Sequence, residues 1–163
     1  MFVNRLIEDC PPLDQNSAYC NFLQCGHFSE TSAAAIYENH LIGFVSGYIQ
    51  PDRPDTLFIW QIAVHKKSRG VGLSTSMLLD IVSRNSKKIS FIETTITRDN
   101  EASWNTFRSL ARLLSANLAA EKWIDRESHF KGMHDSEYLV RIGPYKYNKK
   151  QIEEKIREKY ENI

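Results

Sequence analysis

The sequence lacks any apolar stretch close to the roughly 18 residues that a membrane-spanning helix needs. It also lacks an excess of charge, because 21 basic and 20 acidic residues leave a net charge of +1, which offers no bulk attraction to nucleic acid or to an anionic membrane. The first residues carry Arg5, Glu8 and Asp9 among their apolar positions, unlike a secretory signal. These absences predict a cytoplasmic protein that binds neither a membrane nor nucleic acid.

Cysteine is scarce, and the three cysteines, Cys10, Cys20 and Cys25, form no C-x-x-C pair. Three is an odd number, and a reducing compartment would keep all of them as thiols. His27 would be the fourth ligand of a zinc site, but the spacing matches no common metal-binding motif. We therefore expect no metal ion and no disulfide.

The sequence does have the composition of an ordinary globular domain, with 163 residues of which 42% are hydrophobic and 25% charged. That length is typical of a single domain. We expect the domain to cover residues 1–145 and a charged, helical tail to cover residues 146–163. In the tail Ile152 and Ile156 lie one turn apart. A solvated terminal helix and a helix that binds a partner both fit this pattern.

Apolar periodicity predicts helices alternating with strands. Helices are expected at about residues 2–9, 15–25, 73–82 and 100–114, and strands at 32–37, 41–49, 56–64, 89–97, 128–130 and 137–142. Tyr19, Phe22 and Leu23 are the apolar residues of the second helix. The strand at 56–64 is almost continuously apolar, which predicts burial on both of its faces. The order of elements indicates an α/β (α+β) fold with a sheet flanked by helices.

A basic turn with two glycines, residues 65–72, separates the strongest strand from a helix. The N–H groups at a helix N-terminus have no partner within the helix and attract anions. Gly70 and Gly72 let the backbone approach a phosphate closely. The turn therefore predicts a phosphate-binding site, although it matches neither the P-loop nor the dinucleotide-binding motif. Three cations add to its positive charge: Lys66, Lys67 and Arg69.

The segment Arg69-Gly70-Val71-Gly72-Leu73-Ser74 resembles the R/Q-x-x-G-x-G/A pyrophosphate loop of the Gcn5-related N-acetyltransferases (GNAT), with Ser74 in place of the last Gly or Ala. The order strand, loop, helix, strand and capped helix is similar too. The resemblance implies a GNAT fold, whose mixed, mostly antiparallel sheet splays between the strands at 56–64 and 89–97 to admit the pantetheine arm of acetyl-CoA. The usual first strand of that superfamily is absent, since this chain begins at the helix.

The same resemblance implies acetyl-CoA as cosubstrate and identifies its contacts. The loop that runs through Arg69, Gly70, Val71, Gly72, Leu73 and Ser74 would bind the pyrophosphate. The backbone that follows the strand centre would hydrogen-bond the pantetheine like an added strand, at Ile62, Ala63 and Val64. Asn100 and Phe107 are expected to contact the cofactor. Phe107 stands where many relatives carry a tyrosine that protonates the departing thiolate, which phenylalanine cannot do.

Further blocks resemble one family of that superfamily, the L-2,4-diaminobutyrate acetyltransferases of ectoine biosynthesis. The blocks are PPLDQNS at 11–17, CGHFSETS at 25–32, GFVSGYI at 43–49, FIWQIAVH at 58–65, ETTIT at 93–97, DNEAS at 99–103 and HF-x-G-x-H at 129–134. The family implies acetylation of the 4-amino group of L-2,4-diaminobutanoate, a role in osmotic stress and a homodimer.

Two carboxylates are candidates for the proton acceptor or for the anchor of a substrate ammonium. Glu93 lies on the strand at 89–97, where a carboxylate among apolar neighbours is suited to proton transfer, unless it faces outward. Glu30 is the second candidate and can bind either amino group of a diamine. Ser32 can hydrogen-bond the substrate carboxylate, although hydroxyls at a strand start are as often structural.

Trp60 and Gln61 are neighbours on a strand, so their side chains face opposite sides unless the strand bulges there, as strands of this superfamily do. Trp60 is a candidate catalytic residue or a core side chain, and Gln61 a candidate for substrate binding. His134 is a candidate proton relay or a surface imidazole. Cys25 and Phe28 are expected to line the substrate pocket, because no partner spacing supports an acyl-cysteine route.

These residues fit direct attack of an amine on the thioester within a ternary complex. Two other functions stay open. One is a GNAT enzyme for a different acceptor, such as a polyamine, an aminoglycoside or a protein amine. The other is an acyl-CoA-binding module without turnover, for which Phe107 is the only support.

Overall fold

The computed structural model describes residues 2–161, with side chains described as far as residue 157. The chain divides between Ile89 and Ser90 into two compact units, which are described one at a time. Among the described residues, none of the helices combines the length and the apolar character needed to cross a membrane.

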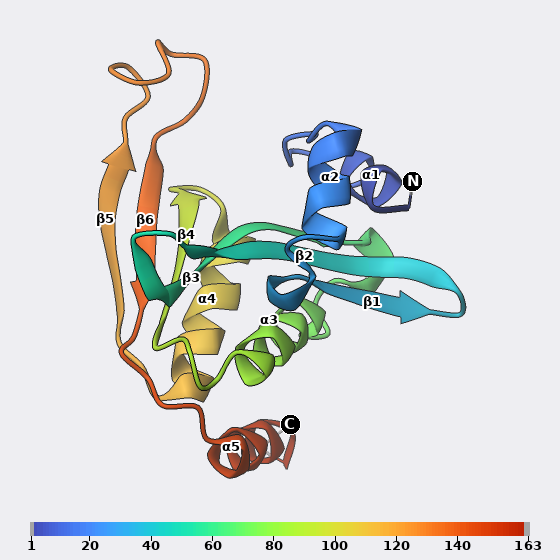
Figure 1. The fold of residues 1–163 in the computed structure, drawn as a ribbon, viewed down its shortest axis with the longest axis vertical. Coiled ribbons are helices and arrows are strands. Elements are labelled where there is room, and N and C mark those ends of the chain that lie inside the picture. Colours follow the sequence, from blue (N-terminus) through green and yellow to red (C-terminus); the bar gives the residue numbers. More distant parts are fainter. Residues whose placement is uncertain (1, 162–163) are drawn as a thin grey trace. The chain divides into compact units, whose positions relative to one another are not determined.

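The first unit is a three-stranded sheet with helices on both faces (Figure 1). The strands pair antiparallel in the order β1-β2-β3. In chain order, the elements of this unit are α1 (Phe2–Glu8), α2 (Ala18–Cys25), the 3-10 helix η1 (Ser29–Thr31), β1 (Ala33–Tyr37), β2 (His40–Gln50), β3 (Arg53–Val64), the 3-10 helix η2 (Lys66–Ser68) and α3 (Leu73–Arg84).

The core of this unit lies on both faces of β2. On one face, Phe44 packs in a buried cluster with the apolar stripe of α1, as the spacing of that stripe predicts. The neighbouring Gly43 faces the other side, where an added Cβ would lie 2.8 Å from Met77 of α3. The helices predicted at 2–9 and 73–82 are therefore confirmed, and each covers its own face of the sheet.

The strands predicted at 32–37 and 41–49 are confirmed, and they form a hairpin. Its two-residue turn consists of Glu38 and Asn39, whose φ angles of 47° and 61° are both left-handed. Such a pair matches the twist of the two strands, and asparagine tolerates this conformation better than most residues.

Two expectations for β3 are wrong. The strand begins at Arg53 rather than at residue 56, so Pro54 and Asp55 belong to it. Burial on both faces fails at Trp60, whose side chain is 53% exposed. An apolar run therefore does not establish that both faces of this strand are covered.

The second unit contains three further strands, which pair antiparallel in the order β4-β6-β5. Its elements are β4 (Phe91–Thr97), α4 (Glu101–Leu114), β5 (Leu118–Ile124), β6 (Glu137–Ile142) and α5 (Lys149–Glu161). The helix predicted at 100–114 is confirmed, including its cap, since the side chain of Asn100 accepts a hydrogen bond from the Ser103 N–H at 3.1 Å.

The strand predicted at residues 128–130 is wrong, because that segment is a turn. Asp125 organises it: one carboxylate oxygen accepts the N–H groups of Glu127 at 2.9 Å and Ser128 at 3.0 Å. The two backbone N–H groups that donate to Asp125 are therefore not available for pairing with a neighbouring strand. Ion pairing with Lys122 and the backbone N–H donors hold the pKa of Asp125 below its usual range.

The C-terminal tail forms a helix, as predicted, and in the second unit it docks on α4 (Figure 1). The Lys155 ammonium donates to the Arg112 carbonyl and to the Ser115 hydroxyl, both at 2.6 Å. Gln151 also donates to the Ser115 hydroxyl, and Ile152 is buried. Part of the tail is therefore packed rather than solvated.

Candidate active site

The glycine turn has the geometry of an anion site. Gly70 and Gly72 have φ angles of 81° and 82°, a conformation that favours glycine. Gly72 is also the N-cap of α3, and having no side chain it leaves the first N–H groups of the helix uncapped. These groups and the helix dipole attract a negatively charged ligand.

The end of β3 holds this turn in place. The carbonyl of Val64 accepts hydrogen bonds from the Arg69 Nε at 3.0 Å and from the Cys10 Sγ at 3.3 Å. The neighbouring residues Ile62 and Ala63 pair with β2. Arg69 therefore turns back onto the strand, which places its positive charge beside the turn.

A β-bulge in β3 puts Trp60 and Gln61 on the same side of the sheet. Gln61 pairs with Ser46 and Ile59 with Gly47, so Trp60 is the extra residue. The Trp60 ring makes an edge contact with Tyr48, at 6.4 Å between centroids. Since Tyr48 is two residues from Ser46, it shares a face with Gln61. The structure thus meets the condition under which both predicted residues can line one site.

Gln61 itself is occupied by an internal network. Its Nε2 donates to the Asp14 carbonyl at 2.8 Å, and its Oε1 accepts from the Asn16 Nδ2 at 2.9 Å. Asn16 also donates to the Asn21 Oδ1 at 3.2 Å. In this structure Gln61 ties β3 to the segment that enters α2, and its predicted role in substrate binding stays a prediction.

Helix α2 buries its polar face and exposes its apolar face. Its buried residues are Asn21 and Gln24, whereas Tyr19 and Phe22 are 72% and 61% exposed. Buried polar side chains also lie outside α2: Ser46 on β2, Gln61 on β3 and Ser32 directly before β1. Within the described residues, the Gln24 Oε1, the Ser32 Oγ and the Ser46 Oγ have no hydrogen-bond partner.

Sequence reasoning missed Gln24 and Ser46. A glutamine on a helix and a serine on a strand are usually exposed, so neither attracts notice in a single sequence. The sequence of α2 carries no signal for them, because the apolar stripe of Tyr19, Phe22 and Leu23 predicts burial of the apolar face and exposure of the polar one.

The predicted substrate residues between α2 and β1 are mostly exposed. Phe28 is 42% exposed, and the Glu30 carboxylate makes no hydrogen bond or ion pair with any described residue. Partial burial raises the pKa of the Cys25 thiol, which disfavours the nucleophilic thiolate. The raised pKa argues against an acyl-cysteine route, and the place of Cys25 in the substrate pocket stays a prediction.

In the second unit Glu93 is buried and forms an ion pair with Arg141, its neighbour across β4 and β6. The Arg141 guanidinium also stacks on the Phe91 ring at 3.9 Å. The apolar surroundings expected for Glu93 therefore include a cation, which the sequence did not reveal. Arg141 is the second functional candidate that sequence reasoning missed.

The other predicted residues of this unit differ in exposure. Phe107 is 2% exposed. Asn100 is exposed, with its Oδ1 engaged in capping α4. His134 is exposed in the β5–β6 loop, with its ring 5.2 Å from that of Phe130. Among residues 2–161 there is no group of three or more His, Cys, Asp or Glu side chains able to hold a metal ion.

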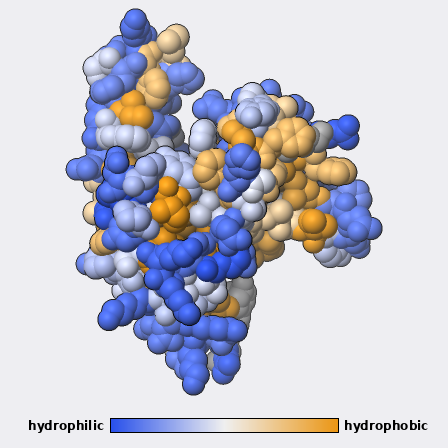
Figure 2. Space-filling view, viewed as in Figure 1, coloured by the Kyte–Doolittle hydropathy of each residue, from blue (hydrophilic) through white to orange (hydrophobic). Residues whose placement is uncertain are grey.

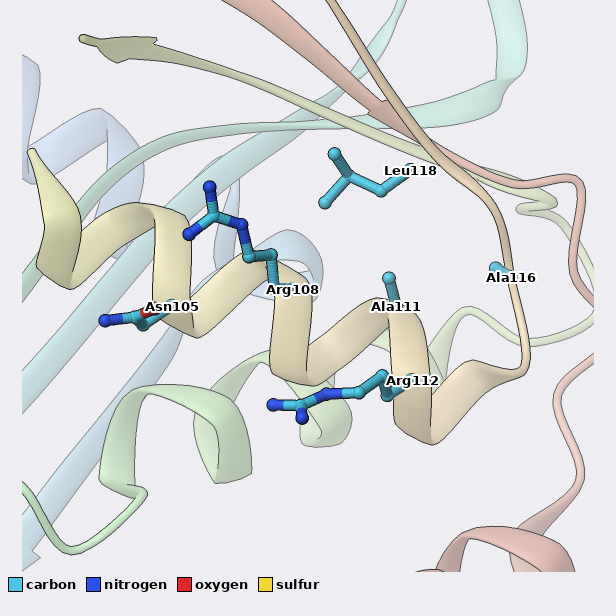
Figure 3. Close-up of a pocket in the computed structure, with 6 residues that line it drawn as sticks. All are labelled: Asn105, Arg108, Ala111, Arg112, Ala116 and Leu118. Carbon is cyan, nitrogen blue, oxygen red and sulfur yellow. The ribbon is translucent and has the colours of Figure 1, made fainter.

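A surface pocket of about 470 Å³ lies between α4 and the start of β5 (Figure 3). Arg108 and Arg112 project from successive turns of α4 at its rim, and Ala111, Ala116 and Leu118 line it. None of the residues predicted from the sequence lines this pocket.

The fold and the glycine turn define the class of protein. Residues 2–111 match the family model described as the acetyltransferase (GNAT) family. A solved structure of diaminobutyrate acetyltransferase from Paenibacillus lautus, in complex with L-2,4-diaminobutyric acid and coenzyme A, superposes with a TM-score of 0.83 at 34% identity, covering 90% of this chain and 89% of that one. The expected GNAT fold is confirmed.

Sequence relatives narrow the class further. The L-2,4-diaminobutyric acid acetyltransferase of Methylotuvimicrobium alcaliphilum is 52% identical over 145 residues, which cover 88% of this chain and 84% of that protein. Its counterpart in Vibrio parahaemolyticus is 48% identical over 141 residues, covering 86% and 78%. The chain therefore belongs to the GNAT acetyltransferases and, within them, to the L-2,4-diaminobutyric acid acetyltransferase family.

Replacing Gly70 with valine is expected to raise the KM for acetyl-CoA about tenfold, because a branched side chain keeps a phosphate from the backbone and disfavours the positive φ. No atom lies within 4 Å of the added Cβ, so the cost to the fold is the strain of the positive φ alone. Steady-state kinetics of Gly70→Val are compared with those of Gly132→Val, which replaces an exposed-loop glycine of similar φ, 79°. An unchanged KM in Gly70→Val would remove this turn from the cofactor site.

Proposed function

We propose that this protein transfers the acetyl group of acetyl-CoA to the 4-amino group of L-2,4-diaminobutanoate, forming N4-acetyl-L-2,4-diaminobutanoate, the ectoine precursor. The observation that carries the proposal is the likeness to the Paenibacillus lautus enzyme, which was solved with this diamino acid and coenzyme A. The uncapped glycine turn before α3 supports the cofactor half of the proposal.

The chemistry begins with a protonation problem. An alkyl ammonium with a pKa near 10 is neutral in about one molecule in a thousand at pH 7, a penalty of ~4 kcal/mol. After losing its proton, the amine nitrogen attacks the thioester carbonyl carbon and a C–N bond forms. The C–S bond then breaks, and the departing thiolate of coenzyme A takes up a proton. No covalent enzyme intermediate is needed.

We propose Glu93 and Glu30 as the candidates that bind the ammonium or accept its proton, with Trp60 and His134 beside the reacting groups. Cys25, Phe28, Ser32 and Gln61 would contact the diamino acid. Phe107 has no proton to donate, so the thiolate is protonated by another group or by solvent. The turn at residues 69–74, with Asn100 and the backbone of residues 62–64, would bind acetyl-CoA.

Changing Glu93 to glutamine is expected to lower kcat by about a hundredfold, because the amide keeps the shape of the side chain but can neither accept a proton nor attract an ammonium. The measurement is kcat with saturating substrates, with circular dichroism to confirm the fold. Glu30→Gln is the parallel variant. A wild-type kcat in Glu93→Gln, alongside a reduced one in Glu30→Gln, would transfer the role to Glu30.

The direct test of the function is release of free thiol from acetyl-CoA by the purified protein in the presence of L-2,4-diaminobutanoate. A panel containing a polyamine, an aminoglycoside and a peptide amine distinguishes acceptors by kcat/KM, and the zwitterionic diamino acid is expected to be the best. A faster reaction with another amine favours the alternative acceptor. Calorimetric binding of coenzyme A with no thiol release from any amine favours the non-catalytic module.

We also propose that the protein is a homodimer. Four exposed apolar side chains of the first unit support this: Tyr19, Phe22, Ile36 and Tyr37, each at least 61% exposed. Figure 2 shows hydrophobic side chains on the surface of the region that α2 and β1 occupy in Figure 1. A group of exposed apolar side chains often marks a surface that contacts another protein chain. Light scattering should give twice the chain mass, and a monomer mass at micromolar concentration would contradict the proposal.

A cytoplasmic location and a role in osmotic stress complete the proposal. The near-zero net charge and the family support them. Deleting the gene is expected to slow growth at high salt and to be rescued by the acetylated product. Equal growth of the deleted and parent strains would contradict this role.

A further inference from the structure

The segment that carries two predicted substrate residues, Glu30 and Ser32, is clamped to the end of α3 by one side chain. The Arg84 Nη1 donates to the carbonyls of Ser29 at 3.2 Å and Glu30 at 2.8 Å, and its Nη2 donates to the carbonyl of Ser32 at 2.6 Å. Asp80, one turn earlier in α3, orients the guanidinium by accepting from its Nε at 3.0 Å. One arginine thus holds three carbonyls of a four-residue segment.

Two neighbouring groups complete the clamp. The Asn85 Nδ2 donates to the Glu30 carbonyl at 2.9 Å and to the Ile81 carbonyl at 2.9 Å. The Thr31 hydroxyl donates to the Gly47 carbonyl at 2.6 Å. The backbone of η1 is therefore attached to α3 on one side and to β2 on the other.

Two polar side chains of this segment, those of Glu30 and Ser32, make no such contacts in the part of the chain that the structure describes. The Glu30 carboxylate has no hydrogen bond or ion pair within the described residues, and neither does the buried Ser32 hydroxyl. A segment held only for stability would be expected to satisfy a buried hydroxyl. A rigid backbone with unpaired polar side chains is instead the arrangement of a preorganised binding site, in which the cost of ordering is met before the ligand arrives.

We propose that Arg84, assisted by Asn85, is a positioning residue that holds Glu30 and Ser32 in place to bind the amino-acid acceptor. Glu30 supplies the negative charge that an ammonium group requires, and Ser32 supplies a hydroxyl for its hydrogen bonds. Arg84 touches neither substrate and acts through the backbone of residues 29–32. This inference deepens the proposed function and rests on it.

The clamp requires arginine rather than positive charge alone. The planar guanidinium presents several N–H donors in a fixed fork, so it reaches three carbonyls and Asp80 together. A lysine ammonium is a single point with three donors and cannot span them. The same helix begins at the glycine turn, so α3 joins the predicted cofactor site to the acceptor segment within the first unit.

The test is the variant Arg84→Lys, which keeps the charge and removes the fork. The KM for L-2,4-diaminobutanoate is expected to rise about tenfold, equivalent to ~1.4 kcal/mol, while the KM for acetyl-CoA changes by less than about twofold. Hydrogen exchange at the amides of residues 29–32 should become faster. Arg112→Lys is the matched control, because Arg112 also lies in the last turn of a helix, α4.

Three results would overturn the inference. If the KM for L-2,4-diaminobutanoate did not change although hydrogen exchange became faster, the clamp would have only a structural role. An equal rise in the KM values for L-2,4-diaminobutanoate and acetyl-CoA would lead to the same conclusion. The same acceptor KM in Arg84→Lys and Arg112→Lys would also end it. If Arg84→Lys does not fold, Asn85→Ser provides the second variant, with a smaller rise in the same KM expected. Failure of the proposed function is separate, since the wild-type protein would then release no thiol with this acceptor.

Discussion

Replacing Arg141 with methionine is expected to lower the free energy of unfolding by about 3–5 kcal/mol, because it leaves a buried carboxylate without its cation. The Glu93 side chain has 0% exposure, whereas Arg141 is 32% exposed, so the partner that loses its cation is the more deeply buried one. The cation–π contact of Arg141 with Phe91 is lost as well. Urea denaturation measures the effect as a lower midpoint with an unchanged slope.

The control is the double variant Glu93→Leu with Arg141→Met. Removing both charges leaves no unpaired ion, and apolar pairs of similar volume are often as stable as the buried ion pair they replace. The double variant is therefore expected to recover most of the stability. If it were as unstable as Arg141→Met alone, the loss would come from packing and not from the unpaired charge.

A second large effect is expected when Gly143 is replaced with alanine. Its φ angle of 135° is rarely adopted by residues with a side chain. The added Cβ would lie 2.6 Å from the Ser90 carbonyl oxygen and 2.6 Å from the Phe91 ring. Because one of these neighbours is backbone, the strain cannot be relieved by a rotamer change, and a loss of about 3 kcal/mol or more is expected.

Gly132→Ala is the matched control for this substitution. Gly132 also has a positive φ, 79°, but its nearest neighbour to an added Cβ is the end of the Glu127 side chain at 3.8 Å. Only the conformational cost of about 1 kcal/mol remains. Similar unfolding midpoints for the two variants would show that the close approach at Gly143 relaxes easily.

The elements predicted correctly from the sequence are those that carry a local signal. The stripes of α3 and α4 recur at the helical period, and Asn100 stands at the cap position of α4. The hairpin has Asn39 in a turn that demands left-handed residues. In each case the residues that determine the structure lie within a few positions of one another.

The failures have non-local causes. Among the strands that the structure describes, β5 pairs only with β6 and is mostly exposed, so its sequence shows no alternation of apolar residues. The inverted polarity of α2 depends on Ser46 and Gln61, which lie far along the chain. No pattern within either segment contains this information.

In the candidate site, too, local features could be predicted from the sequence and contacts between distant residues could not. The glycine turn could be predicted because its function depends on backbone conformation at adjacent residues. The ion pair of Glu93 with Arg141 joins residues 48 positions apart, and the bond of Arg84 to the Ser32 carbonyl joins residues 52 positions apart. Glu93 and Ser32 could be identified from the chemistry of their side chains. Their partners, Arg141 and Arg84, became apparent only in the folded structure.

The bulge at Trp60 has a consequence for insertions and deletions in the gene. Ile59 and Gln61 pair with the consecutive residues Gly47 and Ser46, so β2 and β3 would pair regularly if Trp60 were removed. A one-codon deletion at Trp60 would therefore leave all the remaining side chains of β3 on their present faces. Deleting the codon of Ile59 instead would bring the tryptophan into the buried position of Ile59. This strand can thus gain or lose an indole at its surface without a change of register.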